Sequence, residues 1–319
     1  MKRTVLIVLS LGLLVWCSLN LTGCQRKPAA DAETVIGLTV PSLTHPFFIH
    51  LRDNVLDEAE KLGVKVIVVD AEDVAARQLS TVEDFIARRV SGVLISPIGA
   101  DSLVPAIEAL NEAGIPVATV DRQVNGGQVF VHVGADNVEG GRAAARYLVE
   151  KLGDQGKIIE LEGTPGASPA IARKKGFHEV VDASKLELLA SQTGDFKRAT
   201  GQSVMENLLQ VHREFQGVFA ANDEMMLGAI EAMDANKVDP DKVITISYDA
   251  IPEALASIRD GKLDATVEQF PGKQARTALQ ILVDHIRKGT MPESKEVFLK
   301  PVVITSANLD EAERKADAK

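Results

Sequence analysis

Three features are scarce in this chain of 319 residues: cysteine, aromatic side chains and positive charge. Two cysteines exclude a fold held by a disulfide framework, and the length leaves room for two domains with cores of their own. One Trp, two Tyr and ten Phe leave few rings to stack on a ligand. Lys and Arg number 35 against 45 Asp and Glu, and the net charge of −10 has the wrong sign for neutralising phosphates. This argues against a nucleic acid partner.

Catalytic motifs are also lacking. Residues 166–170 read GASPA, without the last glycine of G-x-S-x-G and with Pro169 where an oxyanion hole needs a backbone N–H. His178 and Glu179 are not followed by the second histidine of H-E-x-x-H, and Lys157 is not preceded by the first glycine of a P-loop. The sequence therefore predicts a protein that is not an enzyme, with no cofactor and no metal site.

The N-terminus has the pattern of an export signal. Lys2 and Arg3 precede an apolar run from Val5 to Trp16, and no further charge occurs before Arg26. The run is shorter than the roughly 20 residues that a membrane-spanning helix needs. A cleaved signal peptide is therefore favoured, and an uncleaved anchor is the alternative.

The next residues predict where this signal ends. Leu21-Thr22-Gly23-Cys24 resembles a bacterial lipobox, in which the cysteine is lipidated and becomes the first residue of the mature protein; a chance cysteine is the alternative. Removal of residues 1–23 would leave a more acidic chain with one thiol and no tryptophan. Residues 24–33 would form a polar tether. We expect lipid anchoring through Cys24, in the periplasm or on the outer face of a bacterial membrane.

From Thr34 onward, short β-branched runs alternate with amphipathic stretches of helical length, which is typical of a parallel α/β protein. Apolar residues recur at helical spacing in residues 48–62, 79–89 and 136–152. The strand candidates are almost continuously apolar, as a sheet covered on both faces requires. They are Val35–Val40, Val64–Asp70, Gly92–Ser96, Pro116–Asp121, Lys157–Glu162, Leu186–Ser191, Gly217–Ala220, Val243–Tyr248 and Ala265–Glu268.

So many strands would make one sheet unusually wide, so we expect two doubly wound lobes. In open parallel sheets, ligands bind at the carboxyl ends of the strands. Polar residues follow the strand candidates in both halves: Asp121-Arg122, Asn222-Asp223, Asp249 and Gln269. One such residue is usually a helix cap, but this distribution predicts a cleft between lobes that is lined with hydrogen-bonding groups.

At these residues the chain resembles the periplasmic sugar-binding proteins of ABC transporters, most closely the ribose-binding members, over nearly all of its mature length. The matching stretches are Leu38–Arg52 (LTVPSLTHPFFIHLR), Thr119–Gln123 (TVDRQ), Ala190–Arg198 (ASQTGDFKR), Val218–Ala229 (VFAANDEMMLGA) and Gly261–Pro271 (GKLDATVEQFP).

The resemblance implies the type I periplasmic binding protein fold, an α/β fold with two doubly wound parallel-sheet lobes joined by a three-strand hinge. The expected N-terminal lobe comprises residues 34–135 and 270–298. The expected C-terminal lobe comprises residues 136–269 and 299–319. The chain would cross between them near Ala135, Gln269 and Leu299.

The resemblance also implies a sugar site. Phe47 and Phe48 from the first lobe and Phe196 from the second would pack on the C–H faces of the sugar. A carboxylate beside a guanidinium can serve both the donor and the acceptor role of vicinal hydroxyls, and aromatic rings cover the apolar side of the ligand. The expected hydrogen-bonding residues are Asp121, Arg122, Arg173, Asn222, Asp249 and Gln269.

His45 and Ser96 depart from the ribose-binding pattern, which has asparagine at both positions. We count both as substrate-binding residues and expect ribose first, then a related pentose, ketohexose or polyol. If His45 accepts a hydrogen bond from a sugar hydroxyl, its protonation near pH 6.5 would weaken binding between pH 7.5 and 5.5. The alternative is a histidine that caps a helix beginning near Pro46.

Asp121 and Asp249 could also be read as the carboxylate pair of a glycosidase. Arg122 beside Asp121 would keep that carboxylate ionised, which suits binding better than acid catalysis. A sugar-responsive repressor is a further alternative, but it would need a helix-turn-helix unit where residues 1–33 read as signal and tether.

These predictions describe an extracytoplasmic, lipid-anchored monomer that closes on a monosaccharide and feeds an ABC importer. Its partner would be the permease in the cytoplasmic membrane, docked through acidic lobe surfaces. Delivery of the sugar signal to a membrane chemoreceptor or sensor kinase stays open as the alternative.

Overall fold

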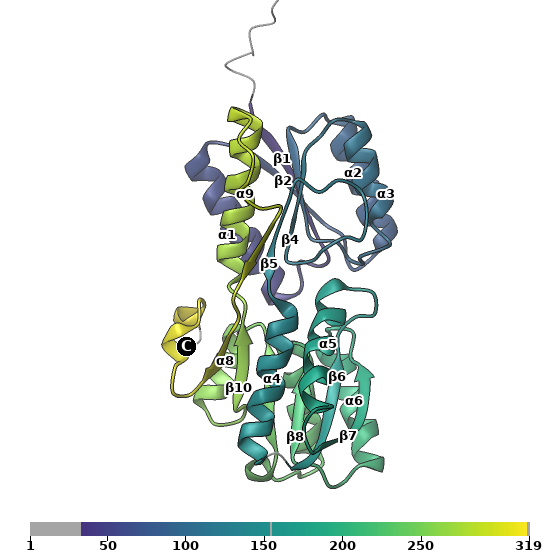
Figure 1. Cartoon of the computed structure of the whole chain (residues 1–319), viewed down its shortest axis with the longest axis vertical. Helices are drawn as coiled ribbons and strands as arrows, with labels where there is room; N and C mark the ends of the chain where they lie inside the picture. Colours follow the sequence, from purple (N-terminus) through teal and green to yellow (C-terminus); the bar gives the residue numbers. More distant parts are fainter. Residues whose placement is uncertain (1–32, 154, 318–319) are drawn as a thin grey trace, which may run out of the picture. The chain divides into compact units, whose positions relative to one another are not determined.

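The computed structural model describes residues 33–153 and 155–317. The predicted signal peptide, the lipidation site Cys24 and the tether up to residue 32 lie outside the described residues. In the described part, the strands form two six-stranded sheets with helices packed on them (Figure 1). None of the helices in this part is long and apolar enough to cross a membrane. The predicted fold class is confirmed.

The first sheet has the strand order β11-β5-β4-β3-β1-β2, and all of its paired strands are parallel. Helices α1 (Pro46–Leu62) and α9 (Pro271–Lys288) cover one face, and α2 (Ala75–Ala87) and α3 (Val104–Glu112) cover the other. We call this unit the first lobe. Its strands are β1 (Val35–Val40), β2 (Lys65–Asp70), β3 (Gly92–Ile95), β4 (Val117–Val120), β5 (Val131–Ala135) and β11 (Glu296–Leu299).

The second sheet has the order β12-β10-β9-β8-β6-β7, and only β12 runs antiparallel to its neighbour. We call this sheet and its helices the second lobe. Its strands are β6 (Gly156–Glu162), β7 (Leu186–Thr193), β8 (Gly217–Ala220), β9 (Ile244–Tyr248), β10 (Ala265–Glu268) and β12 (Val302–Thr305). Its helices are α4 (Asn137–Leu152), α5 (Ser168–Val181), α6 (Arg198–Val211), α7 (Asp223–Ala235) and α8 (Pro252–Arg259).

The chain passes between the sheets after β5, after β10 and between β11 and β12. The passages are neighbours in space because β11 pairs with β5 in one sheet and β12 pairs with β10 in the other. The carboxyl ends of β4, β8, β9 and β10 are each followed by a predicted site residue. This topology gathers residues from distant parts of the sequence between the two lobes.

All nine predicted strands are present, and β1, β8 and β10 have the predicted bounds. The sequence patterns did not reveal β5, β11 and β12. β11 and β12 lie at sheet edges, where they need less apolar sequence, and Pro301 separates them. β5 contains His132, a polar residue that interrupts the apolar pattern. His132 is buried, and its Nδ1 is hydrogen-bonded to the Thr119 hydroxyl at 2.9 Å. Strand pairing distant in sequence therefore creates these elements.

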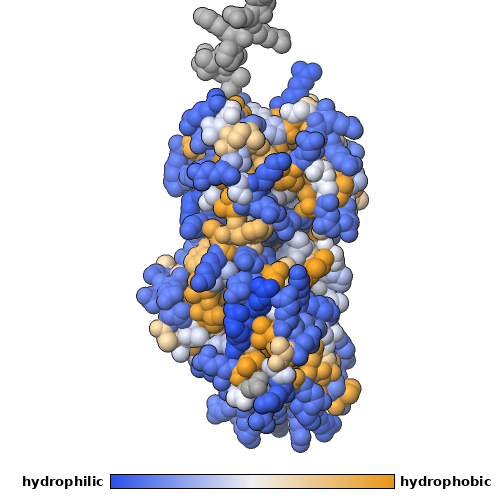
Figure 2. All heavy atoms as spheres, viewed as in Figure 1, coloured by the Kyte–Doolittle hydropathy of each residue, from blue (hydrophilic) through white to orange (hydrophobic). Residues whose placement is uncertain are grey.

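Apolar side chains fill both faces of each sheet and leave a mostly polar exterior. In the view of Figure 2, polar residues cover most of the visible surface of the described part, and apolar residues are scattered among them. Leu38, Phe85 and Phe219 are fully buried, each in a different cluster of apolar side chains. The described part of this acidic chain thus obtains its stability from ordinary apolar burial.

Helices α4 and α5 pack unusually closely, and two glycines permit this. A Cβ atom at Gly176 would collide with the carbonyl oxygen of Val138, and one at Gly141 would collide with that of Arg173. Larger side chains would push the helices apart. The close packing matters because Asn137 begins α4 and Arg173 lies on α5, and a hydrogen bond joins the two side chains.

Candidate functional site

A small cavity lies between the two lobes, and the free space inside it is about 20 Å³, room for about one water molecule. All the predicted sugar-contact residues except Ser96 line it, and Pro169 is an addition. The lining residues are His45, Phe47, Phe48, Asp121, Arg122, Pro169, Arg173, Phe196, Asn222, Asp249 and Gln269.

A larger hollow exists in the second lobe, lined by residues 209–216 and 236–243. It lies at the amino ends of β8 and β9, away from the edge where parallel sheets bind ligands. Within the described residues, no group of three or more His, Cys, Asp or Glu side chains is placed to hold a metal ion. The interlobe cavity is therefore the candidate site.

The backbone at the cavity is strained. Asp121, Phe196 and Asp249 have φ values of 64°, 58° and 112°, in a region that side-chain-bearing residues rarely adopt. Each such residue costs about 1–3 kcal/mol and persists only where the surrounding structure holds it. Asp121 and Asp249 directly follow β4 and β9, Phe196 lies in the loop between β7 and α6, and all three line the cavity. Such clustering is typical of functional sites.

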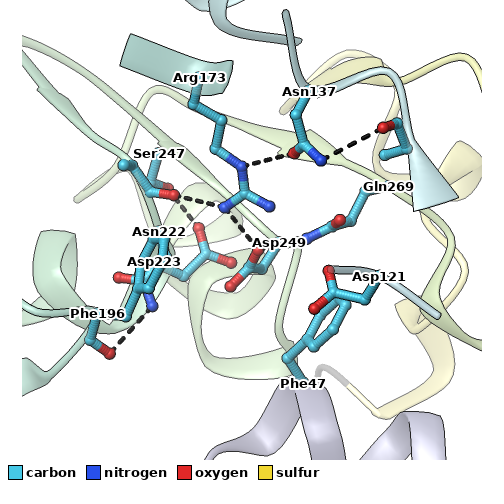
Figure 3. A network of polar contacts seen from close by, with 12 residues as sticks. Phe47, Asp121, Asn137, Arg173, Phe196, Asn222, Asp223, Ser247, Asp249 and Gln269 are labelled. Atoms are coloured by element: carbon cyan, nitrogen blue, oxygen red, sulfur yellow. Dashed lines mark hydrogen bonds and ion pairs between the residues drawn. The ribbon is translucent and has the colours of Figure 1, made fainter. Parts of the chain in front are cut away.

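Arg173 is the centre of a polar network in the second lobe (Figure 3). Its Nε donates to Asn137 Oδ1 at 2.8 Å and its NH1 donates to the carbonyl oxygen of Ala221 at 2.6 Å. NH1 also lies 3.4 Å from Asp249 Oδ1. The guanidinium carbon lies 3.6 Å from the centroid of the Tyr248 ring, a cation–π contact. This arrangement fixes the plane of the guanidinium.

Asp249 lies between Arg173 and Gln269, whose Nε2 donates to Asp249 Oδ1 at 2.6 Å. Burial raises the pKa of Asp249 well above its usual value, although the nearby Arg173 opposes this shift. The orphaned Gln269 Oε1 has no hydrogen-bond partner among the described residues. A ligand hydroxyl carries one proton, which it can donate to either of these two oxygens.

Asp223 lies behind this network and supports it. Its carboxylate accepts from the Ser247 and Thr266 hydroxyls and from the backbone N–H of Ile251. Burial raises the pKa of Asp223 to about 7. These bonds hold the strained turn that carries Asp249, so Asp223 acts on the cavity through that turn.

The first lobe supplies Asp121 and Arg122. Arg122 Nε lies 3.7 Å from Asp121 Oδ2, an ion pair without a hydrogen bond, and Nε has no hydrogen-bond partner among the described residues. Arg122 NH1 donates to the carbonyl oxygen of Ile98 at 3.0 Å. The guanidinium lies 5.3 Å and 5.6 Å from the ring centroids of Phe48 and Phe196. It thus stands between aromatic rings from both lobes.

The electrostatics of Asp121 differ from the sequence-based expectation. Burial raises the pKa of Asp121, and Arg122 only partly opposes this effect. The expectation considered the neighbouring cation and missed the larger desolvation of a buried carboxylate. The hydroxyl of Ser96 donates to Asp121 Oδ2 at 3.2 Å, and this hydrogen bond also opposes the rise in the pKa of Asp121. Ser96 is fully buried behind Asp121 and does not line the cavity.

His45 is both a helix cap and a cavity residue. Its Nδ1 accepts from the backbone N–H of Phe47 at 3.2 Å, at the start of α1, and its ring lines the cavity. Burial, reinforced by Arg122, Arg173 and Arg314, lowers the pKa of His45 to about 3. The expectation that His45 titrates near pH 6.5 within the site is therefore wrong for this conformation, because three guanidinium groups and desolvation disfavour the imidazolium.

Sequence reasoning missed Asn137, Tyr248 and Pro169. Asn137 and Tyr248 act by contacting the Arg173 side chain. The search for polar residues after strand candidates did not select either of them. Pro169 was considered only in excluding a hydrolase motif. The one available signal was Tyr248, a tyrosine immediately before Asp249 in a chain with two tyrosines.

The geometry agrees with comparisons to known proteins. The family model described as "Periplasmic binding protein domain" matches residues 36–290. The chain belongs to the periplasmic binding protein family. Its members named below are binding proteins rather than enzymes, which agrees with the lack of catalytic motifs.

Three relatives show the range of this family. The ribose import binding protein RbsB of Bacillus subtilis (strain 168) is 43% identical over 290 residues, covering 87% of this chain and 92% of the relative. The crystal structure of a Caulobacter myo-inositol binding protein with myo-inositol has a TM-score of 0.86 and 39% identity, covering 90% of this chain and 98% of that one. The fructose binding periplasmic domain of the hybrid two component system BT1754 has a TM-score of 0.82 and 28% identity, covering 88% and 93%.

Proposed function

We propose that this chain is the extracytoplasmic binding protein of a sugar ABC importer and that it binds a monosaccharide in the interlobe cavity. The observation that carries the proposal is the composition of the cavity wall. Two guanidinium groups, two carboxylates and three phenylalanine rings converge there from both lobes. Hydroxyl groups on a small ring need paired donors and acceptors, and their C–H faces pack on aromatic rings.

Binding would be coupled to closure of the lobes. A ligand that touches both lobes stabilises the closed form by its greater affinity for that form. The three neighbouring chain passages are suited to act as the hinge. The expected division is residues 34–135 and 270–298 in one lobe, with residues 136–269 and 299–319 in the other.

D-ribose and myo-inositol are the first candidates for the ligand, because relatives at 43% and 39% identity are named for them. A thermal-shift screen of pentoses, hexoses and cyclitols tests the proposal. A sugar at 100 times its dissociation constant adds about 2.7 kcal/mol to the free energy of unfolding. Stabilisation by one of these sugars, absent in Asp249→Ala, is the expected result. No stabilisation by any neutral monosaccharide or cyclitol would overturn the proposal.

The lipoprotein part of the proposal is supported by the lipobox-like sequence at Cys24 and by membership of a family of periplasmic binding proteins. The protein would be a monomer, anchored through Cys24 and presented to the permease of the cytoplasmic membrane. Cys24→Ala should give a protein that is not lipidated and leaves the membrane fraction. A wild-type protein that already fractionates as soluble would remove the anchor and leave the sugar proposal intact.

A sensory role is the second candidate, because a relative at 28% identity is a periplasmic domain of a hybrid two component system. The sugar chemistry would be the same, and only the membrane partner would differ. Crosslinking of the sugar-loaded protein in its own membrane distinguishes them. A permease as the captured partner supports transport, and a receptor or kinase supports sensing.

A further inference from the structure

Two helix caps meet across the cavity. His45 caps α1 of the first lobe and Asn222 caps α7 of the second, where Asn222 Oδ1 accepts from the backbone N–H of Met225 at 3.0 Å. His45 Nε2 lies 3.0 Å from Asn222 Nδ2, and that amide nitrogen also donates to the carbonyl oxygen of Phe196 at 3.2 Å. Both side chains line the cavity. Ligand chemistry can therefore be deduced from the donors and acceptors around them.

Both ring nitrogens of His45 face an N–H donor, because Nδ1 faces the Phe47 N–H and Nε2 faces the Asn222 amide nitrogen. A neutral imidazole has one N–H and one lone pair in either tautomer. It can therefore accept from only one of these two donors. The nearby oxygens are already engaged, Asn222 Oδ1 by the Met225 N–H and the Phe196 carbonyl by the Asn222 amide. Exchanging the tautomer of His45 changes only which donor is left over, and rotating the Asn222 amide would place its nitrogen against the Met225 N–H.

The two helix caps decide which donors are left over. The Phe47 N–H needs His45 Nδ1 as its acceptor, so the remaining proton of His45 is on Nε2. Asn222 Oδ1 is engaged by Met225, so the Asn222 amide presents its nitrogen to His45. Two N–H donors from opposite lobes consequently face the same point of the cavity wall, and buried donors without an acceptor are unfavourable.

We propose that His45 and Asn222 form a donor pair that selects a ligand oxygen with two free lone pairs at this point. The proposal rests on the proposed function and specifies its ligand. A ring oxygen, or a hydroxyl whose own proton is donated elsewhere, meets the requirement. The carboxylates of Asp121 and Asp249 are the acceptors for such protons on the cavity wall. The site is thus polarised, with ligand acceptors at His45–Asn222 and ligand donors at the aspartates.

Charge around His45 reinforces this selection. Arg122 follows β4, Arg173 lies on α5 and Arg314 lies in the C-terminal segment, and all three disfavour a positive charge at His45. An ammonium group has no lone pair to offer and would meet the same cations. Amino sugars with nitrogen at this position should therefore bind far more weakly than the parent sugar, by about a hundredfold or more.

Closure should also carry a pH dependence through His45. In an open form exposed to water, its pKa would be near the usual value of about 6.5, whereas in this closed arrangement it is lowered to about 3. Protonation adds one more donor to a cluster that already has too many. Below pH 6.5 the open form gains a proton that the closed form rejects, so affinity should fall about tenfold between pH 7.5 and 5.5. Asp121 and Asp249 oppose this trend, because burial raises both of their pKa values.

Ligand analogues test the donor pair directly. The probe is D-ribose or myo-inositol, whichever binds more tightly, with its monodeoxy, monodeoxyfluoro and, for ribose, carbocyclic analogues. Calorimetry of wild type and His45→Ala should reveal one oxygen whose removal weakens wild-type binding tenfold or more but weakens the variant less than threefold. Fluorine at that position, which accepts but does not donate, should restore part of the loss. A coupling below threefold at every oxygen would overturn the proposal while leaving sugar binding established.

The pH series uses His45→Asn, whose side chain can still cap α1 but does not titrate. His50→Asn is the matched control, because His50 lies on the same helix and contacts Asn54 and Glu313 instead of the cavity. Wild type and His50→Asn should lose affinity from pH 7.5 to 5.5 relative to His45→Asn, by about tenfold. The same pH profile in all three proteins would overturn the role of His45. Binding of no sugar by the wild type would instead refute the proposed function.

Discussion

The two lobes hold their cavity arginines in different ways. Arg173 of the second lobe donates hydrogen bonds to three protein oxygens, including the Asp249 carboxylate at 3.4 Å, and has an aromatic ring at 3.6 Å. Arg122 of the first lobe has one hydrogen bond, to Ile98, and its carboxylate neighbour lies at 3.7 Å without a hydrogen bond. One guanidinium is fixed by its own lobe, and the other has donor capacity left for a ligand.

This difference indicates a division of work. A preorganised group contributes to affinity because little ordering remains to be done on binding. The second lobe thus presents a preorganised binding surface for the sugar. The first lobe adds Arg122, which lies between Phe48 and Phe196 when the lobes meet. Substitutions of the two arginines should therefore separate stability from binding.

The largest effect is expected for Arg173→Ala. It leaves Asp249 as an unpaired buried carboxylate, and breaking a buried ion pair costs about 3–5 kcal/mol. Both the free energy of unfolding and sugar binding should fall, measured by denaturant titration and calorimetry. Lys175→Ala, an exposed neighbour on the same helix, should change neither. A stability loss below about 1 kcal/mol for Arg173→Ala would contradict the interpretation that the second lobe is preorganised around Arg173.

Arg122→Ala should affect binding more than folding. Truncating one partner of a buried charge pair at an interface costs about 2–5 kcal/mol of binding free energy, whereas the single hydrogen bond to Ile98 contributes about 1 kcal/mol to folding. Arg122→Lys keeps the charge but loses the planar fork, so it should recover only part of the affinity. If Arg122→Ala destabilises the unliganded protein as much as Arg173→Ala does, both lobes hold their arginine equally firmly, and the proposed difference between the lobes is wrong.

The smallest effect is expected for Lys197→Ala at the rim. Lys197 Nζ of the second lobe lies 3.2 Å from Asp73 Oδ2 of the first, and the two side chains are 55% and 40% exposed. Exposed pairs contribute about 0.2–1 kcal/mol and are screened by salt. Sugar affinity should fall at most about fivefold, and the difference from wild type should disappear at high salt. An effect as large as that of Arg122→Ala would mean that the rim, rather than the cavity wall, controls closure.

The sequence predicted the fold class from periodicity and the site from resemblance, and both depend on local patterns. Asp121, Asn222, Asp249 and Gln269 follow strands, and the ends of parallel strands face one edge of a sheet, so strand position alone indicates that these residues converge. β5, β11 and β12 escaped prediction because their pairing partners, rather than their own composition, define them.

The tertiary structure decided how each group acts. Sequence placed Ser96 and His45 in one class, but burial puts Ser96 behind Asp121, and the Phe47 N–H fixes the donor side of His45. Sequence gave no sign of Asn137 and only a weak one of Tyr248, and these two residues orient Arg173 from α4 and β9. The sequence by itself determined which chemical groups are available and along which strands they stand. Only the folded chain sets their burial and their partners, and desolvation and hydrogen bonding determine charge, tautomer and ligand preference.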